Sequence, residues 1–202
     1  MKNPPKPDET NQEILVSLSS KQHLGPLDEP VHAWLAGGFA VCYWTQRRMS
    51  GHVDIMWSHR IAIPPDMRVF EISGSGGETG TCPVVMDGGF RDVLGSFPPD
   101  WKKRAQELHR FDNIVLAVID AVDLAESKVA RFSARDREDI QALAQLGLVN
   151  VEVFSSRAEE ALSRYAGALT FVRSNLAAAT EIIEHAAREP LCAERMAPPR
   201  PW

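Results

Sequence analysis

The amino-acid sequence predicts an α/β fold in which a domain with a mixed sheet precedes a C-terminal bundle of helices. Short apolar segments of strand length, bounded by glycine, proline and polar residues, recur up to about residue 120. After residue 120, apolar residues recur at helical spacing. The 202 residues suffice for one sizeable core, or for a small α/β domain with a helical appendage.

The composition divides the chain into four segments. Both ends are rich in proline and polar residues, so residues 1–12 and 191–202 are expected to be disordered tails. We expect the α/β domain in residues 13–120 and the helical bundle in residues 121–190, because the hydrophobic pattern changes from strand-like to helical between them.

Five strands are expected in the α/β domain. The first one stops at the pair Gly37-Gly38, and the segment FAVCYWTQRR after this pair has the character of a helix. A glycine-rich loop, SGSGGETGT, precedes the fourth strand, and residues 100–108 are expected to contain a helical turn. The strands are VHAWLA (31–36), HVDIMW (52–57), MRVFEI (67–72), CPVVMD (82–87) and NIVLAVID (113–120).

Four helices are expected in the bundle. Gly147 closes the second of them as a glycine just beyond the helix end. Either Ser155 or Ser156 is expected to cap the start of the third. The helical segments are DLAESKVARF (123–132), ARDREDIQALAQLG (134–147), SSRAEEALSRYAG (155–167) and TFVRSNLAAATEIIEHAARE (170–189).

The composition indicates a soluble cytoplasmic protein. Hydrophobic residues make up 44% and charged residues 24%, as in ordinary globular proteins, and the net charge of −5 provides no overall basic surface for nucleic acid. Cys42, Cys82 and Cys192 are widely spaced and form no CxxC pattern, which suits a reducing compartment. The chain begins with no apolar signal segment, and no apolar run approaches the roughly 20 residues of a membrane span.

The glycine pair Gly37-Gly38 is compatible with two roles. Glycines between a strand and a helix let backbone amides approach an anion at the helix N-terminus. A bare glycine pair is more often a tight turn between a strand and a helix. The pair is part of neither a GxGxxG nor a GK[ST] pattern, and GSGG at 74–77 is interpreted as a flexible loop.

A single acid, Asp54, stands in the apolar strand HVDIMW. A carboxylate between Val53 and Ile55 costs free energy unless it is exposed, paired or bound to a metal. His52 lies two positions earlier and therefore on the same face of the strand. The two residues form either a site for a divalent cation or an ordinary hydrogen-bonded pair.

Four more charged residues follow the same order along the chain. Asp87 ends an apolar strand, and Lys128 lies on a predicted helix. Asp136 and Asp139, in the segment RDRED, share one face of the next helix. Each of these residues taken alone is most simply a solvated charge.

The whole series resembles a known superfamily. Its segments are LAGGFAV, RMSGHVDI, VVMD, DLAESKVARF and RDREDIQAL, over about residues 30–150. In this order they resemble the nucleotidyltransferases with a DNA-polymerase-β-like fold. The resemblance is greater to the bacterial branch of abortive-infection and toxin–antitoxin nucleotidyltransferases and their uncharacterised relatives.

The resemblance implies a nucleotide site at the end of the first strand. Gly37 and Gly38 would contact the nucleoside triphosphate through backbone amides. Arg48 and Ser50, in the segment that precedes the family's acids, would also bind the nucleotide. Asp54 would be the second acid of the family's D-x-D metal pair.

The remaining residues of the series also receive roles from the resemblance. Asp87 would be the third carboxylate, which helps to deprotonate the attacking hydroxyl. Lys128 would pair with phosphates, and Asp136 and Asp139 would orient basic residues or bind substrate in the second lobe.

His52 departs from the family pattern, because the family has the first acid of D-x-D at this position. Mg²⁺ prefers oxygen ligands, whereas imidazole suits Zn²⁺, Ni²⁺ or Mn²⁺ better. A neutral histidine also removes one negative charge from a site that holds dications. Asp54, Asp87 and His52 are thus the candidate metal ligands, and the departure favours either altered metal use or a domain that binds without catalysis.

We therefore expect a bacterial protein that transfers a nucleotide from an NTP to a hydroxyl of an RNA, a protein or a small molecule, with Mg²⁺ or Mn²⁺ as cofactor. A toxin role would imply an antitoxin partner. The alternative is a catalytically degenerate relative that acts as a binding or regulatory, antitoxin-like module. A third interpretation is an unrelated α/β binding protein, in which Asp54 and Asp87 lie far apart.

Overall fold

The computed structural model describes residues 29–45, 52–59, 69–73, 81–87, 97–111 and 113–189. For the segments 69–73 and 81–87 it describes the path of the backbone. Several predictions concern other parts of the chain. The tails 1–12 and 191–202, the loop 74–77, and the candidate residues Arg48 and Ser50 all lie outside the described residues.

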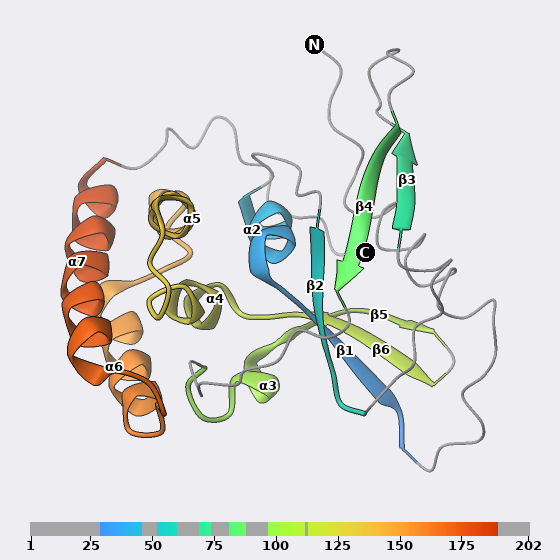
Figure 1. The fold of residues 1–202 in the computed structure, drawn as a ribbon, viewed down its shortest axis with the longest axis horizontal. Coiled ribbons are helices and arrows are strands. Elements are labelled where there is room, and N and C mark those ends of the chain that lie inside the picture. The colour runs from blue at the N-terminus through green and yellow to red at the C-terminus, as the bar shows by residue number, and fades with distance from the viewer. Residues whose placement is uncertain are drawn as a thin grey trace.

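The first part of the chain folds into one mixed six-stranded sheet, which confirms the predicted fold class (Figure 1). The strand order is β3-β4-β2-β1-β6-β5. β1 runs antiparallel to β2 and parallel to β6, and β2 runs parallel to β4. The strands are β1 (Val31–Ala36), β2 (His52–Trp57), β3 (Val69–Ser73), β4 (Thr81–Asp87), β5 (Gln106–Phe111) and β6 (Ile114–Val118).

A helical turn was predicted over residues 100–108, and this prediction was wrong for the second half of that segment. The helix α3 spans only Trp101–Arg104, and β5 follows it and pairs antiparallel with β6 at the edge of the sheet. Leu108 is the buried side chain of this strand, while its described neighbours are polar and at least partly exposed. Charged side chains are typical of edge strands, and here they conceal the apolar alternation that identifies a strand.

The helices after the sheet pack together, as predicted. α7 contacts both α5 and α6, and α6 contacts α4 (Figure 1). α2 follows β1 and contacts α4 and α5 as well as the sheet. The helices are α2 (Gly37–Thr45), α4 (Ala121–Ser127), α5 (Ala134–Gln145), α6 (Val151–Leu162) and α7 (Leu169–Arg188).

Capping residues determine where these helices begin and end. Gly147 has φ +70°, and its N–H donates to Ala144, so the prediction of a terminal glycine is confirmed. The prediction that Ser155 or Ser156 starts α6 was wrong. Asn150 caps this helix, because its side chain accepts hydrogen bonds from the N–H groups of residues 152 and 153.

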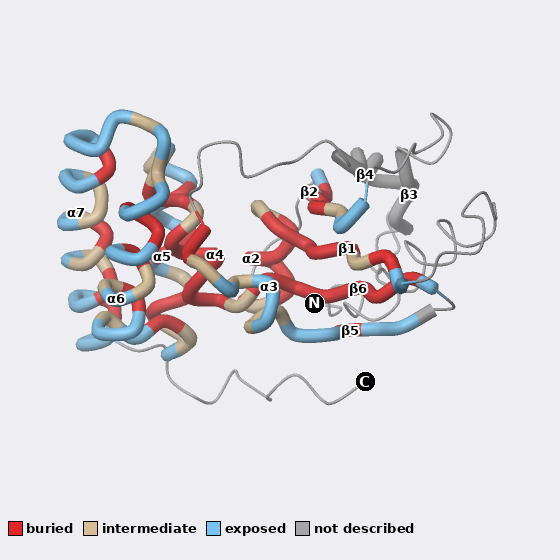
Figure 2. The backbone as a smooth tube through the Cα atoms, turned by 90° about the horizontal axis from the view of Figure 1, so that it is seen from below, coloured by how far each residue is buried: buried red, intermediate tan, exposed pale blue. Residues whose placement is uncertain are grey.

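One hydrophobic core extends from the sheet into the helices. Figure 2 shows the buried backbone of β1, β6, α2 and α4, whereas β5 and the outer faces of α6 and α7 are exposed. Leu35 and Leu116 are fully buried in the sheet, and Ile140 and Phe154 are fully buried in the helices. Burying each such side chain stabilises the fold by about 1.5–3 kcal/mol.

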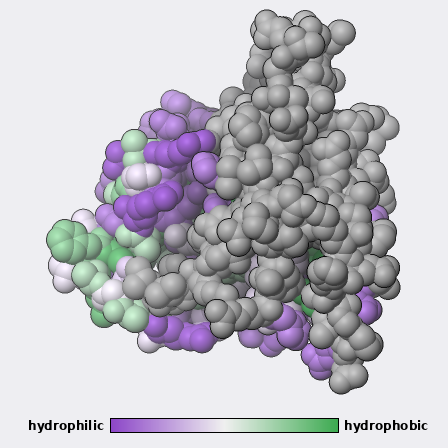
Figure 3. All heavy atoms as spheres, turned by 45° about the vertical axis from the view of Figure 1, so that its right-hand side comes forward, coloured by the Kyte–Doolittle hydropathy of each residue, from purple (hydrophilic) through white to green (hydrophobic). Residues whose placement is uncertain are grey.

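The described surface is mainly hydrophilic on the side shown in Figure 3, with a smaller apolar area. The exposed large apolar side chains among the described residues are Val153, Leu169 and Phe171, on α6 and α7. Within the described part of the chain, no helix combines the length and the hydrophobicity that crossing a membrane requires.

Candidate functional site

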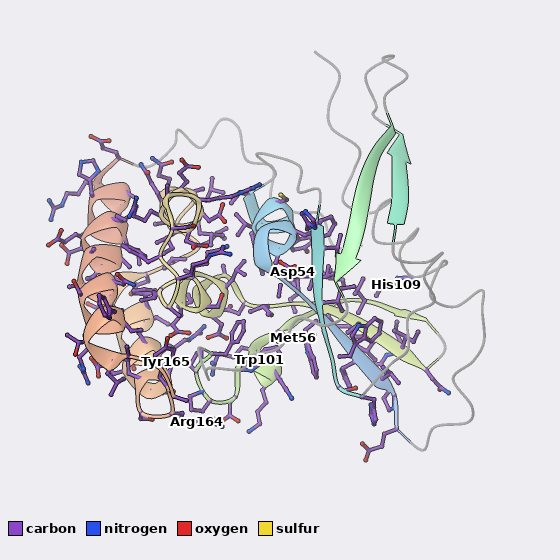
Figure 4. The ribbon with its side chains drawn as sticks, viewed as in Figure 1. Asp54, Met56, Trp101, His109, Arg164 and Tyr165 are labelled. Carbon is purple, nitrogen blue, oxygen red and sulfur yellow. The ribbon has the colours of Figure 1, made fainter. Side chains whose placement is uncertain are left out.

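Asp54 lies against the glycine turn between β1 and α2. The antiparallel register of β1 and β2 places Ala36 opposite Asp54, and Gly37 is the next residue (Figure 4). A Cβ atom built on Gly37 would lie 2.8 Å from Cγ of Asp54, and closer still to its Oδ2. Gly37 also has φ +60°, a conformation that side chains disfavour. The carboxylate therefore occupies space that only a glycine leaves open.

The same turn begins the nine-residue helix α2. The first N–H groups of a helix have no partner within it, and they form the positive end of the helix dipole. No acidic residue stands in the first turn of α2. Gly37 and Gly38 thus provide a stretch of backbone that an anionic group can approach, next to the carboxylate of Asp54.

Asp87 is the register partner of Asp54 on the neighbouring strand. β2 and β4 run parallel, and Asp87 is the last residue of β4. Adjacent strands lie about 4.8 Å apart, so the sheet places the backbones of the two acids side by side. An unrelated binding protein with these residues far apart in the fold is inconsistent with this register.

His52 is the first residue of β2, and its side chain is exposed. It lies two positions before Asp54, so both residues belong to the same face of the strand. Among the residues that the structure describes, no three His, Cys, Asp or Glu side chains are grouped closely enough to hold a metal ion. The role of His52, Asp54 and Asp87 as metal ligands therefore stays a prediction from the sequence.

An aromatic group continues the same face of the sheet beyond Asp54. Met56 is the next residue on this face, and Trp34 is its register partner on β1. The ring of Trp34 stacks on His32 at 5.5 Å and meets the edge of Trp101 at 5.2 Å. Nζ of Lys102 lies 4.9 Å from the centre of the Trp34 ring. Figure 4 shows Met56 and Trp101 below Asp54, farther from α2 than Asp54 is.

Lys128 is held by the two acids of α5 in the interior. Its Nζ lies 2.8 Å from Oδ2 of Asp139 and 3.8 Å from Oδ1 of Asp136. All three residues are buried, with 6% of Lys128 exposed. A lysine buried with its charge must be paired in this way, because an unpaired charge in the interior is very costly. The two acids thus share one helical face, as the spacing predicted, and this face points at Lys128.

Asp136 also binds Arg131 and the start of its own helix. Nε and Nη2 of Arg131 donate to the two carboxylate oxygens at 2.8 and 2.7 Å. The N–H and hydroxyl of Ser133 donate to Oδ2 at 2.9 and 2.7 Å, and Ser133 caps α5 in return. Burial raises the pKa of Asp136, but the hydrogen bonds from Arg131 and Ser133 outweigh it and lower the pKa to about 2.

The charge of Asp54 also acts on Arg131. The hydrogen bonds with Asp136 raise the pKa of Arg131, and the negative charge of Asp54 contributes to the increase. α2 contacts both β2 and α5, so the elements that carry Asp54 and Asp136 pack on a common helix, although they are far apart in the sequence. Arg131 is not singled out by the sequence, in which it is one of several basic residues of the helices.

A second buried ion-pair network joins α3, α4 and α6. Asp123 is fully buried, and Nε and Nη2 of Arg104 donate to its two oxygens at 2.8 and 3.0 Å. This bond raises the pKa of Arg104. Arg157 donates to Asp123 at 3.1 Å and also to Asp120, which caps α4. The network was not predicted, because each member resembles an ordinary surface charge in the sequence.

The comparison with protein families agrees with the site geometry. No curated protein and no solved structure matched the chain. The family model described as nucleotidyltransferase of unknown function, DUF6036, matches residues 23–186. This region covers most of the chain, from before β1 to the last turns of α7, and includes every described candidate residue. The chain therefore belongs to the DUF6036 family of nucleotidyltransferases, which implies that an NTP is its substrate.

Proposed function

We propose that the protein transfers a nucleotide from an NTP to a hydroxyl group of an acceptor, with release of pyrophosphate. The observation that supports this function best is the close approach of the Asp54 carboxylate to Gly37, next to Asp87 in the sheet register. This arrangement combines a glycine turn at a helix N-terminus, which would favour an anion, with two acids that are register partners.

The turn and the acids would have separate tasks. The backbone amides of Gly37 and Gly38 would orient the phosphates at the start of α2. Asp54 and Asp87, with His52 as a third ligand, would hold Mg²⁺ or Mn²⁺. A bound divalent cation would neutralise charge on the triphosphate and favour the attacking form of the hydroxyl. Because His52 adds a nitrogen ligand, we expect Mn²⁺ to support the reaction better than Mg²⁺.

The reaction itself would be an in-line displacement. The oxygen of the acceptor would form a bond to the α-phosphorus, and the bond from this phosphorus to the bridging oxygen of pyrophosphate would break. Asp87 would accept the proton of the hydroxyl. The acceptor would be an RNA, a protein or a small molecule. An RNA acceptor would need a local basic surface, because the chain has a net charge of −5.

A toxin role with an antitoxin partner remains our proposal for the biological setting. It follows from the resemblance to the abortive-infection branch and is not needed for the chemistry. A partner that silences the enzyme would have to cover the end of the sheet at Asp54. A second candidate function is a degenerate, antitoxin-like binding module, and it is favoured by the histidine at position 52.

The decisive experiment is a transfer and binding assay with each of the four NTPs, labelled at the α-phosphate, in Mg²⁺ or Mn²⁺. The wild type is compared with Asp54→Ala and His52→Asp. Transfer of label by the wild type, lost in Asp54→Ala, would support the enzyme. If only the His52→Asp variant binds metal and nucleotide, the natural protein is a catalytically degenerate nucleotidyltransferase. If no variant binds any NTP, the proposed function is wrong.

A further inference from the structure

We propose that Arg131 binds the phosphate groups of the substrate and that Asp136 positions it for this contact. This inference rests on the proposed nucleotidyl transfer and adds a residue to the same site. Arg131 lies on the turn between α4 and α5, outside the glycine turn and the acids of the sheet.

The first reason is that Arg131 is the accessible cation of its cluster. Its side chain is 74% exposed, whereas Lys128 is 6% exposed and already bound to Asp139 at 2.8 Å. For Lys128 to reach a phosphate, this buried ion pair would have to break. That would cost much free energy, because the buried charge of Asp139 would lose this partner. Arg131 can bind an anion without losing any contact.

The second reason is that the guanidinium of Arg131 is fixed on one side and open on the other. Nε and Nη2 each donate one hydrogen bond to Asp136. Within the described part of the chain, Arg131 has no other hydrogen-bond partner. A guanidinium has five N–H donors in a planar fork, so three of them, both on Nη1 and the second on Nη2, are not used by Asp136. Phosphate oxygens match this fork well.

The third reason is that the anchor of Arg131 is rigid. The Asp136 side chain is 1% exposed and receives two further hydrogen bonds from Ser133. Phe132 stands between Arg131 and Ser133 with φ +50°, a conformation that bulky residues rarely adopt. This strained turn allows residues on both sides of Phe132 to reach the same carboxylate. A cation held in advance loses less conformational entropy when a ligand binds.

The fourth reason is the position of Arg131 near the acid of the sheet. α5 packs on α2, the helix that starts at Gly37. The negative charge of Asp54 contributes to the raised pKa of Arg131, although the hydrogen bonds of the guanidinium go to Asp136. A triphosphate bound at the start of α2 would therefore lie beside Asp54 and close to the helix that anchors Arg131.

The alternative is that Arg131 only stabilises the turn between α4 and α5. Substrate binding separates the two roles. A phosphate-binding residue affects ligands that carry phosphates and leaves a nucleoside unaffected. A substitution at a purely structural residue lowers the melting temperature. If it changes binding at all, it changes the affinity for every ligand to the same extent. The substitutions Arg131→Ala and Arg131→Lys provide both a complete and a conservative test, since lysine keeps the charge and loses the fork.

The experiment measures binding of the NTP that the wild type prefers, of inorganic tripolyphosphate and of the matching nucleoside, by calorimetry with the full chain and Mn²⁺. We expect Arg131→Ala to weaken NTP and tripolyphosphate binding about tenfold or more, and Arg131→Lys to weaken both to a smaller extent. Nucleoside binding should stay unchanged. The matched control is Arg173→Ala on α7, where the arginine is also exposed and, among the described residues, forms one ion pair, a 3.6 Å contact with Glu159.

Three results would overturn the inference, and they are distinguishable. If the wild type binds an NTP and both folded Arg131 variants bind it equally well, Arg131 has no role in binding while the proposed function stands. If Arg131→Ala weakens the nucleoside and the triphosphate equally, its role is structural. A wild type that binds no NTP refutes the proposed function and, with it, this inference. Thermal melting of each variant checks that the proteins compared are folded. If Arg131→Ala does not fold, the binding measured with Arg131→Lys decides whether the inference stands.

Discussion

Replacing Gly37 by alanine should damage both the fold and the site, and the structure allows the cost to be estimated. The φ of +60° costs an alanine about 1–2 kcal/mol. In addition, the new Cβ would lie 2.8 Å from Cγ of Asp54, below the separation that Cβ atoms normally keep. Moving the carboxylate aside or shifting the strand costs about 1–3 kcal/mol more. The total loss of unfolding free energy is about 2–5 kcal/mol.

Gly147→Ala is the matched control for this prediction. Gly147 also has a positive φ, +70°, but an added Cβ would meet nothing within 4 Å. Its cost is therefore the backbone part alone. Urea denaturation followed by circular dichroism should show Gly37→Ala to be less stable than Gly147→Ala by about 1–3 kcal/mol. Nucleotide transfer should be lost only in Gly37→Ala.

A double-mutant cycle tests whether Asp54 is the cause. In an Asp54→Ala background the carboxylate is gone, and the nearest atom to the new Cβ is then Cβ of residue 54 at 3.1 Å, which a small shift relieves. Gly37→Ala should then cost nearly as little as Gly147→Ala, with a coupling energy of about 1–3 kcal/mol. If Gly37→Ala costs no more than Gly147→Ala in the wild-type background, the close approach of Asp54 to the turn is wrong.

Three further predictions concern ion pairs and the core. The pKa of Asp136 is lowered from 3.8 to about 2, so its contribution to stability is complete above pH 4 and is lost as the pH falls toward 2. Asp136→Asn should lower the unfolding free energy at pH 7 by about 2 kcal/mol and flatten its decrease over this pH range; an unchanged acid profile would contradict this. Arg104→Ala leaves the fully buried Asp123 with Arg157 alone and should cost about 3 kcal/mol in urea denaturation, and a cost below about 1 kcal/mol would show that the pair is dispensable. Phe154→Ala should cost about 3–5 kcal/mol, because Phe154 is fully buried in the core shared by sheet and helices, and transfer by the folded fraction should persist.

The sequence predicts the elements of this fold wherever the hydrophobic pattern is simple. β1, the glycine turn, α2 and β2 follow from apolar segments interrupted by two glycines, and Gly147 ends α5 as expected. β5 is not predictable in this way, because Leu108 is the only buried residue among those of the strand whose burial is described. α6 begins earlier than predicted because Asn150 caps it in place of the serines.

The candidate site is less predictable than the fold, because its geometry depends on contacts between distant segments. The sequence identifies Asp54 and Asp87 as strand residues, but only the parallel pairing of β2 and β4 brings them together. The proposed role of Arg131 depends on the positive φ of Phe132 and on the paired hydrogen bonds to Asp136. Neither feature can be recognised from the amino-acid sequence.

The continuous core has a consequence for how the site can open and close. The indole of Trp44 donates to the carbonyl of Ile119 at 2.8 Å, and Asn175 on α7 donates to the carbonyl of Val129 at 2.9 Å. These bonds tie α2 to the end of β6 and α7 to the α4–α5 turn, across apolar contacts that run through both parts. Swinging the helices away from the sheet would expose this apolar surface to water. For the proposed nucleotidyl transfer, nucleotide entry and pyrophosphate release should therefore require no hinge between the sheet and the described helices.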